Sequence, residues 1–266
     1  MPKAKVNDLE IYYEIAGSGR PLALISGLGY SLWQWHRMTP ILAEHFQVIT
    51  FDNRGVGQTD KPAGPYTAQM LAADTAGLLD ALGIEKAIVM GHSMGGFIAQ
   101  AMALDFPEKV SKLVLCSTNF GGPRHVPITP EAWAVLSDTT SDPLTRFTNG
   151  LKVSTAPGWA ESHPDEVQAW VQWRIANPPD LGGYQSQMAI GLGLVAEAAS
   201  FENKLPGVRV PALVLFGAHD KVVPPANAGL LAAKLPDARI VILPDAGHFF
   251  PIETPEAASQ AVIEFA

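Results

Sequence analysis

The chain has 266 residues, of which 47% are hydrophobic, and its 18 basic and 26 acidic side chains give a formal net charge of −8 at pH 7. This length and apolar content fit one large α/β domain with room for an inserted subdomain, and they exclude a disordered chain. The negative charge argues against a nucleic-acid or anionic-membrane partner. The first ten residues lack the apolar core of a secretion signal, and no apolar run is long enough to span a membrane, so the sequence predicts a cytoplasmic protein.

Patterns typical of strands and helices alternate along the first part of the chain. Residues 4–17 predict two short strands that turn at Asn7-Asp8. Continuous apolar strands that alternate with helices are typical of a parallel sheet covered on both faces, so the sequence predicts an α/β fold with a mostly parallel central sheet. The further strands are predicted at 21–26, 46–52, 86–91 and 111–117, and the helices up to about residue 45 and over 67–82 and 94–106.

The alternation stops between residues 120 and 205. This segment has no convincing strand, and it carries helical patterns near 130–138, 143–152, 164–176 and 184–195. Strands resume at 210–217 and 239–243, with helices from about residues 226 and 255. We therefore expect a core of residues 1–119 and 206–266, with a helical cap of residues 120–205 that shapes a pocket.

A serine lies between two glycines where a predicted strand ends and a predicted helix begins. Residues 91–95, Gly-His-Ser-Met-Gly, match the pattern G-x-S-x-G. The glycines allow a sharp turn that lifts the Ser93 hydroxyl clear of the sheet, at a helix N-terminus that favours negative charge. A serine that only caps the helix is the alternative, but the strand and helix on either side favour a nucleophile.

A serine nucleophile needs a base, and the base needs a carboxylate to orient it. His248 follows the strand at 239–243, so it lies at the same carboxyl edge of a parallel sheet as Ser93. Asp220 follows the preceding strand. Asp245 is the competing carboxylate, but it lies only three residues from His248 and is better explained as a turn residue. The chain order Ser93, Asp220, His248 is that of one class of hydrolases.

These motifs resemble those of the α/β-hydrolase superfamily, in its serine esterase, enol-lactonase and C–C-hydrolase branches. The resemblance rests on GHSMGG, FDNRGVGQTDKP, FGAHDKVVP and AGHFFPIETPE, and it covers nearly the whole chain outside the cap. It implies catalysis by Ser93, Asp220 and His248, with the backbone N–H groups of Leu28 and Met94 as the oxyanion hole. Where many relatives begin the oxyanion loop with His-Gly, this chain has Ser26-Gly27.

The substrate follows less directly from the residues. The apolar, aromatic cap favours a small-molecule ester or lactone, with Gly27 and Trp159 as candidate substrate-binding residues. The candidates for binding a substrate carboxylate are four cations of the cap: Arg124, Arg146, Lys152 and Arg174. The sequence does not choose among them.

The alternatives to an ester or lactone hydrolase are a C–C bond hydrolase, a cofactor-free perhydrolase or haloperoxidase-like enzyme, and a receptor without turnover. The resemblance implies no cofactor, no cluster has the spacing of metal ligands, and monomer and homo-oligomer both remain open.

Overall fold

An eight-stranded sheet forms the centre of the computed structural model, which describes residues 2–138 and 140–266. The strand order is β1-β2-β4-β3-β5-β6-β7-β8, and β3 to β8 are mutually parallel, whereas β1 and β2 pair antiparallel. This confirms the predicted α/β fold with a mostly parallel sheet. The strands are β1 (Lys3–Val6), β2 (Leu9–Ala16), β3 (Arg20–Ile25), β4 (Phe46–Phe51), β5 (Ala87–His92), β6 (Val110–Cys116), β7 (Ala212–Gly217) and β8 (Ala238–Leu243).

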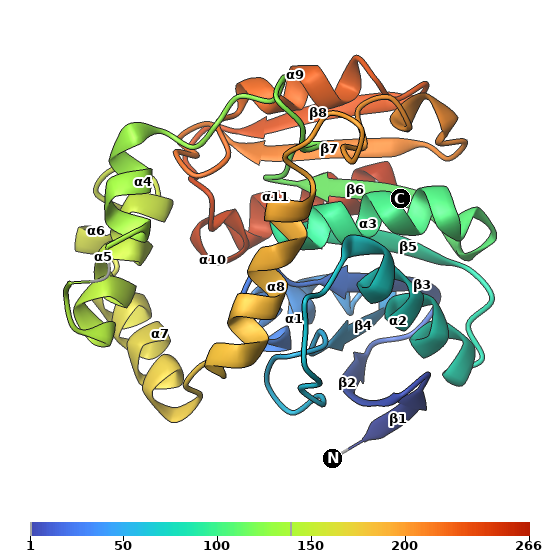
Figure 1. Cartoon of the computed structure of the whole chain (residues 1–266), viewed down its shortest axis with the longest axis horizontal. Helices are drawn as coiled ribbons and strands as arrows, with labels where there is room; N and C mark the ends of the chain where they lie inside the picture. Colours follow the sequence, from blue (N-terminus) through green and yellow to red (C-terminus); the bar gives the residue numbers. More distant parts are fainter. Residues whose placement is uncertain (1, 139) are drawn as a thin grey trace.

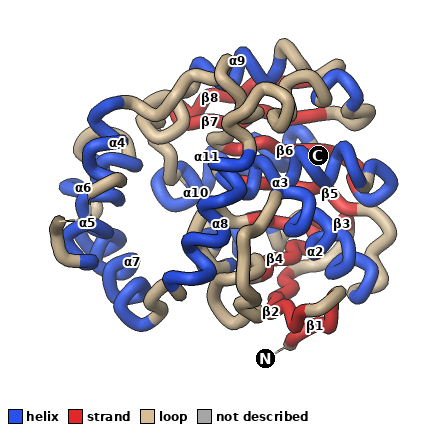
Figure 2. The backbone as a smooth tube through the Cα atoms, viewed as in Figure 1, coloured by secondary structure: helices blue, strands red, loops and turns tan. Residues whose placement is uncertain are grey.

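Helices cover both faces of the sheet (Figures 1 and 2), and the inner strands supply many of the buried apolar side chains of the two main clusters. Every residue of β5 and of β7 is buried, as expected for strands packed on both faces. One face packs against α2, α3 and α9, and the other against η1, α1 and α11. Their bounds are η1 (Leu32–Trp35), α1 (Met38–Leu42), α2 (Ala68–Ala81), α3 (Met94–Asp105), η2 (Pro107–Lys109), α9 (Ala226–Ala232) and α11 (Pro255–Phe265).

Between β6 and β7, the described residues form helices and no strand. Figure 1 shows α4 to α7 grouped to the left of the sheet, while α8 crosses in front of it. Sequence patterns predicted α8 from residue 184, but it begins at Leu181, because Asp180 accepts a hydrogen bond from the Gly183 N–H at 2.7 Å and so caps an earlier turn. The elements are α4 (Pro130–Leu136), α5 (Pro143–Ser154), α6 (Trp159–Ser162), α7 (Pro164–Ala176), α8 (Leu181–Gly193) and η3 (Leu205–Gly207).

Within residues 2–138 and 140–266, no helix combines the length and the apolar character needed to cross a membrane.

A buried glutamate joins the helical segment between β6 and β7 to the loop that follows β8. Glu253, at the end of α10 (Phe250–Glu253), accepts hydrogen bonds from the N–H groups of Ala156 at 2.6 Å and Gly247 at 3.0 Å. The Phe249 N–H donates to the Ser154 carbonyl at 3.1 Å beside it. The amide donors lower the pKa of Glu253, but burial raises it by more, so that the pKa is about 7. This attachment therefore contains a carboxyl group that titrates near neutral pH.

The raised pKa of Glu253 predicts how stability changes with pH. Between the ordinary pKa of 4.5 and about 7, the folded protein binds this proton more tightly than the unfolded chain does. The free energy of unfolding therefore falls as pH rises through this window, by up to about 3 kcal/mol from this group. Glu253→Gln removes the titration, so its loss of stability between pH 5 and pH 8 should be smaller than that of the wild type.

Urea unfolding at the two pH values measures this difference. Glu256→Gln, which removes an exposed carboxylate from the first turn of α11, is the matched control. The same loss of stability in Glu253→Gln as in the wild type would contradict the account.

Candidate active site

The loops after β3, β5, β7 and β8 leave the sheet at one edge, because these strands are parallel. They carry Gly27 and Leu28, Ser93, Asp220 and His248 respectively. This edge is where parallel α/β sheets build their binding sites. The fold therefore brings loops from distant parts of the sequence to one side of the molecule.

Ser93 occupies a strained turn between β5 and α3. Its backbone angles are φ 54° and ψ −117°, a conformation that residues other than glycine rarely adopt. A Cβ at Gly91 would lie 2.0 Å from the Gly95 carbonyl oxygen, and a Cβ at Gly95 would lie 2.2 Å from the Ile25 carbonyl oxygen. Glycine is therefore required on both sides of the serine, which explains the G-x-S-x-G pattern physically.

The main chain around Ser93 is held by hydrogen bonds to β6 and the loop after it. The Ser93 N–H donates to the Cys116 carbonyl at 2.9 Å, and the Thr118 hydroxyl donates to the Ser93 carbonyl at 2.8 Å. Met94 is the first residue of α3, so its N–H has no acceptor within the helix. The Met94 N–H therefore suits an anion bound beside Ser93.

His248 and Asp220 lie in direct contact. The Nδ1 of His248 is 2.9 Å from Oδ2 of Asp220, and both side chains are almost fully buried. The other carboxylate oxygen, Oδ1, accepts from the N–H groups of Val222 at 2.9 Å and Val223 at 2.8 Å. Because the carboxylate can only accept when ionised, Nδ1 carries the hydrogen, and Nε2 is left as the basic nitrogen of the ring.

Asp245, the competing carboxylate, is exposed. Together with His219 and Trp159 it borders a hollow of about 340 Å³, whose lining does not include Ser93 or His248. Trp159 is buried and stacks on His163, with the ring centres 4.7 Å apart. The structure thus places Trp159 at the start of α6, where it borders this outer hollow.

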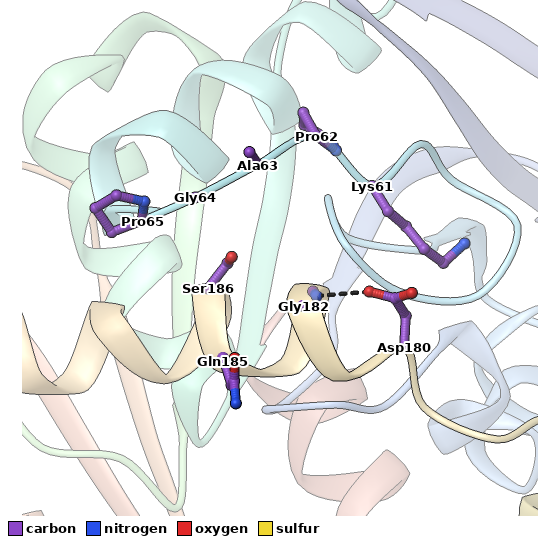
Figure 3. A pocket seen from close by; sticks show the side chains of 10 residues that line it. Lys61, Pro62, Ala63, Gly64, Pro65, Asp180, Gly182, Gln185 and Ser186 are labelled. Atoms are coloured by element: carbon purple, nitrogen blue, oxygen red, sulfur yellow. Dashed lines mark hydrogen bonds between the residues drawn. The ribbon is translucent and has the colours of Figure 1, made fainter.

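A second hollow of about 490 Å³ lies between the loop at residues 61–65 and the start of α8 (Figure 3). Its two charged groups are already engaged: the Lys61 ammonium donates to the carbonyls of Gly57 and Thr59, and Asp180 caps α8. None of the strand-end residues described above lines it. Among the described side chains, no group of three or more His, Cys, Asp or Glu residues could hold a metal ion.

The loop after β3 is fixed by buried side chains that sequence patterns did not reveal. The Gly27 N–H donates to Oε1 of Gln34, and the Gly29 N–H donates to Oε1 of Gln187, both at 2.9 Å. Both glutamines are fully buried. Ser26 donates from its hydroxyl to the Ser31 carbonyl at 3.1 Å. The conformation that presents Leu28 is therefore set by these contacts.

One cation of the segment between β6 and β7 reaches this same loop. Nη1 of Arg174, on α7, donates to the Gly29 carbonyl at 3.3 Å. The guanidinium carbon lies 5.0 Å from the ring centres of both Tyr30 and Phe147. Its Nε is buried and has no hydrogen-bond partner among the described residues. Arg174 is therefore a charged group among aromatic rings with unused hydrogen-bonding capacity.

The other three cations of this segment lie in different surroundings. Arg124 forms ion pairs with Glu202 and Glu197, both at 2.7 Å, and is about half exposed. Lys152 is exposed, and Arg146 is half-buried on α5. Of the four cations named from the sequence, Arg174 is the one in contact with the loop that follows β3.

Comparison with known proteins places the chain in a family. It matches the sequence model of the alpha/beta hydrolase fold over residues 20–255. A Mycobacterium tuberculosis protein named as a non-heme bromoperoxidase is 34% identical over 268 residues, 97% of each chain. An Azorhizobium caulinodans protein named as a carbamate hydrolase is 30% identical over 269 residues, 100% of this chain and 98% of the relative. The crystal structure of the enol-lactonase from Burkholderia xenovorans LB400 superposes with a TM-score of 0.82 at 31% identity, over 99% of both chains. The chain therefore belongs to the α/β-hydrolase superfamily.

Proposed function

We propose that the protein is a serine hydrolase of carboxylic esters or lactones, with Ser93 as nucleophile, His248 as base and Asp220 as the carboxylate that orients the base. The observation that carries this proposal is the 2.9 Å contact between Nδ1 of His248 and Asp220, at the same sheet edge as the strained turn of Ser93. An oriented imidazole and a half-buried serine hydroxyl at a helix N-terminus are the groups that nucleophilic acyl transfer uses.

In the first half of the reaction, the Ser93 hydroxyl oxygen attacks the carbonyl carbon while Nε2 of His248 takes its proton. The negative oxygen of the tetrahedral intermediate accepts hydrogen bonds from the N–H groups of Leu28 and Met94. The bond to the alcohol oxygen then breaks, and His248 returns its proton to that oxygen. The products are a free alcohol and an ester of Ser93, or for a lactone a single opened chain attached to Ser93.

The second half repeats these steps with water. His248 takes a proton from a water molecule as the water oxygen attacks the acyl carbon. The intermediate collapses, and the serine oxygen leaves with the proton from His248. The carboxylic acid is released, and Ser93 and His248 return to their starting states.

Arg174 supports a preference for substrates that carry a carboxylate. Its guanidinium lies against Gly29, next to Leu28 in the loop that holds the developing negative oxygen. Aromatic rings surround it, and its Nε has no partner among the described residues, so a second anionic group on the substrate would satisfy it. An ester or lactone with a free carboxylate on its acyl part has this chemistry.

Residues 120–205 act in this proposal as a cap over the strand-end site, attached to a core of residues 1–119 and 206–266. The cap supplies Arg174, and it contacts the His248 loop at residues 154–156 through Glu253 and Phe249. Trp159 and Gly27 remain candidate substrate-binding residues. A cap that supplies part of the pocket explains how selectivity and chemistry come from different parts of the chain.

Three alternatives use the same fold. Relatives named as a bromoperoxidase and structures described as meta-cleavage product hydrolases bring perhydrolysis and C–C bond hydrolysis into consideration. Turnover of hydrogen peroxide with a carboxylic acid, or of a vinylogous diketone, in preference to every ester and lactone would favour these reactions. Tight ligand binding without turnover of any of them would favour a receptor.

The roles of the three residues can be separated with a fluorophosphonate probe and a p-nitrophenyl ester. The probe should label the wild type once, and Ser93→Ala should abolish labelling. Asp220→Asn should lower kcat by about 10³-fold or more, because the imidazole loses its orientation and tautomer. Asp245→Asn, which changes an exposed carboxylate close by, is the matched control and should retain activity.

Labelling that persists in Ser93→Ala would place the nucleophile elsewhere. A larger loss in Asp245→Asn than in Asp220→Asn would show that the orienting carboxylate is Asp245.

The preference attributed to Arg174 can be measured with two esters of equal acyl length. Mono-p-nitrophenyl glutarate carries a free carboxylate, and p-nitrophenyl valerate does not. Arg174→Met should lower kcat/KM for the glutarate by about 10- to 100-fold, the loss expected for a charged hydrogen bond, and should change valerate hydrolysis little. Arg124→Met, which removes a cation already paired on the surface, is the control. Equal losses on both esters would rule out a role in carboxylate binding.

A further inference from the structure

A second histidine lies beside the proposed base but takes no part in the proposed proton transfers. His92, the residue before Ser93, is 1% exposed, and its ring centre lies 4.7 Å from that of His248. Burial lowers the pKa of His92 well below the ordinary value, and the neighbouring His248 lowers it further. The His92 ring is therefore neutral, with one nitrogen that donates and one that accepts.

The partners of His92 determine which ring nitrogen donates a hydrogen bond and which accepts one. Nε2 lies 2.7 Å from the main-chain carbonyl oxygen of His248, and a carbonyl can only accept, so Nε2 carries the hydrogen. Nδ1 of the neutral ring is then an acceptor, and it lies 2.8 Å from Nε2 of Gln34, which donates to it. This leaves Oε1 of Gln34 facing the Gly27 N–H at 2.9 Å. Each of these three contacts then joins a donor to an acceptor in a single assignment of hydrogens.

The resulting chain of three hydrogen bonds runs from the loop after β3, through Gln34 in η1 and His92 at the end of β5, to the loop after β8. One end is the Gly27 N–H, next to the proposed oxyanion donor Leu28, and the other end is the carbonyl of the proposed base. His92, in the middle, is bonded covalently to Ser93. Gln34 and His92 are both buried, so a break in the chain would leave unsatisfied polar groups inside the protein.

We infer that Gln34 and His92 form a positioning pair that holds the Gly27–Leu28 loop and His248 in place around Ser93. This inference rests on the proposed function, because the pair acts on the reaction only through the groups it positions. Acyl transfer needs the oxyanion donors and the base in place at the same moment, and a displacement of about 1 Å can cost about 100-fold in rate. A buried link between the two loops meets that requirement without contact with the substrate.

Four single variants test the pair. His92→Phe keeps the ring but removes both of its hydrogen bonds, whereas His92→Gln retains a donor for the His248 carbonyl. Gln34→Met removes the acceptor of Gly27 and the donor to His92 at similar volume. Gln100→Met is the matched control, because Gln100 is equally buried and bonds main-chain carbonyls of Gly96 and Asn119. The readouts are the rate of fluorophosphonate labelling, kcat, KM and thermal unfolding.

His92→Phe and Gln34→Met should each slow labelling and lower kcat by about 10- to 100-fold, with KM within about twofold, because substrate binding is left intact. The double variant should be no slower than the slower single variant, since both changes break the same chain. His92→Gln should keep most of the wild-type labelling rate and kcat. Gln100→Met should lower the unfolding temperature without slowing labelling.

Wild-type labelling rates in Gln34→Met and in folded His92→Phe would overturn the inference, as would an equal loss in Gln100→Met. If His92→Phe does not fold, Gln34→Met decides the question alone. If the wild type itself is not labelled, the proposed function is wrong, and hydrogen exchange of the Gly27 N–H then tests the pair by itself. Faster exchange in His92→Phe than in His92→Gln and Gln100→Met supports the link, and equal exchange in all three variants overturns it.

Discussion

The site depends on one backbone constraint, the positive φ of Ser93 between β5 and α3. This turn is possible only because Gly91 and Gly95 have no side chain, and the absence of a Cβ at Gly95 lets the turn pack directly against the end of β3. That contact brings the loop after β3 next to Ser93. The strain is offset by main-chain and hydroxyl hydrogen bonds from β6 and Thr118, which hold the serine where the helix N-terminus favours negative charge.

The loop after β8 connects this turn to the rest of the molecule. The imidazole of His248 in this loop contacts Asp220, and the main-chain carbonyl of His248 accepts a hydrogen bond from His92. Glu253, in α10 directly after the loop, accepts a hydrogen bond from the segment between β6 and β7. The same short stretch therefore carries the proposed base and holds the helical segment between β6 and β7. Only a few buried hydrogen bonds separate that segment from the imidazole of His248.

Sequence patterns predicted the sheet and brought attention to Ser93, Asp220 and His248 because parallel strands end at one edge whatever their order. They missed α6 and α10, since a helix of four residues is too short to show a period, and they placed the start of α8 late because the cap at Asp180 was not recognised. Arg174 could not be chosen among four cations, and Gln34 could not be noticed at all. Both depend on contacts between segments far apart in sequence, which no local pattern encodes.

The central claim is that the reaction passes through an acyl group on Ser93. Rapid mixing with p-nitrophenyl acetate, acid quench and mass spectrometry of the intact protein measure this directly. The account predicts a species heavier by one acetyl group, with the modification on the peptide that contains Ser93. Hydrolysis of the ester without any acylated protein, or an acetyl group found on a different residue, would contradict it.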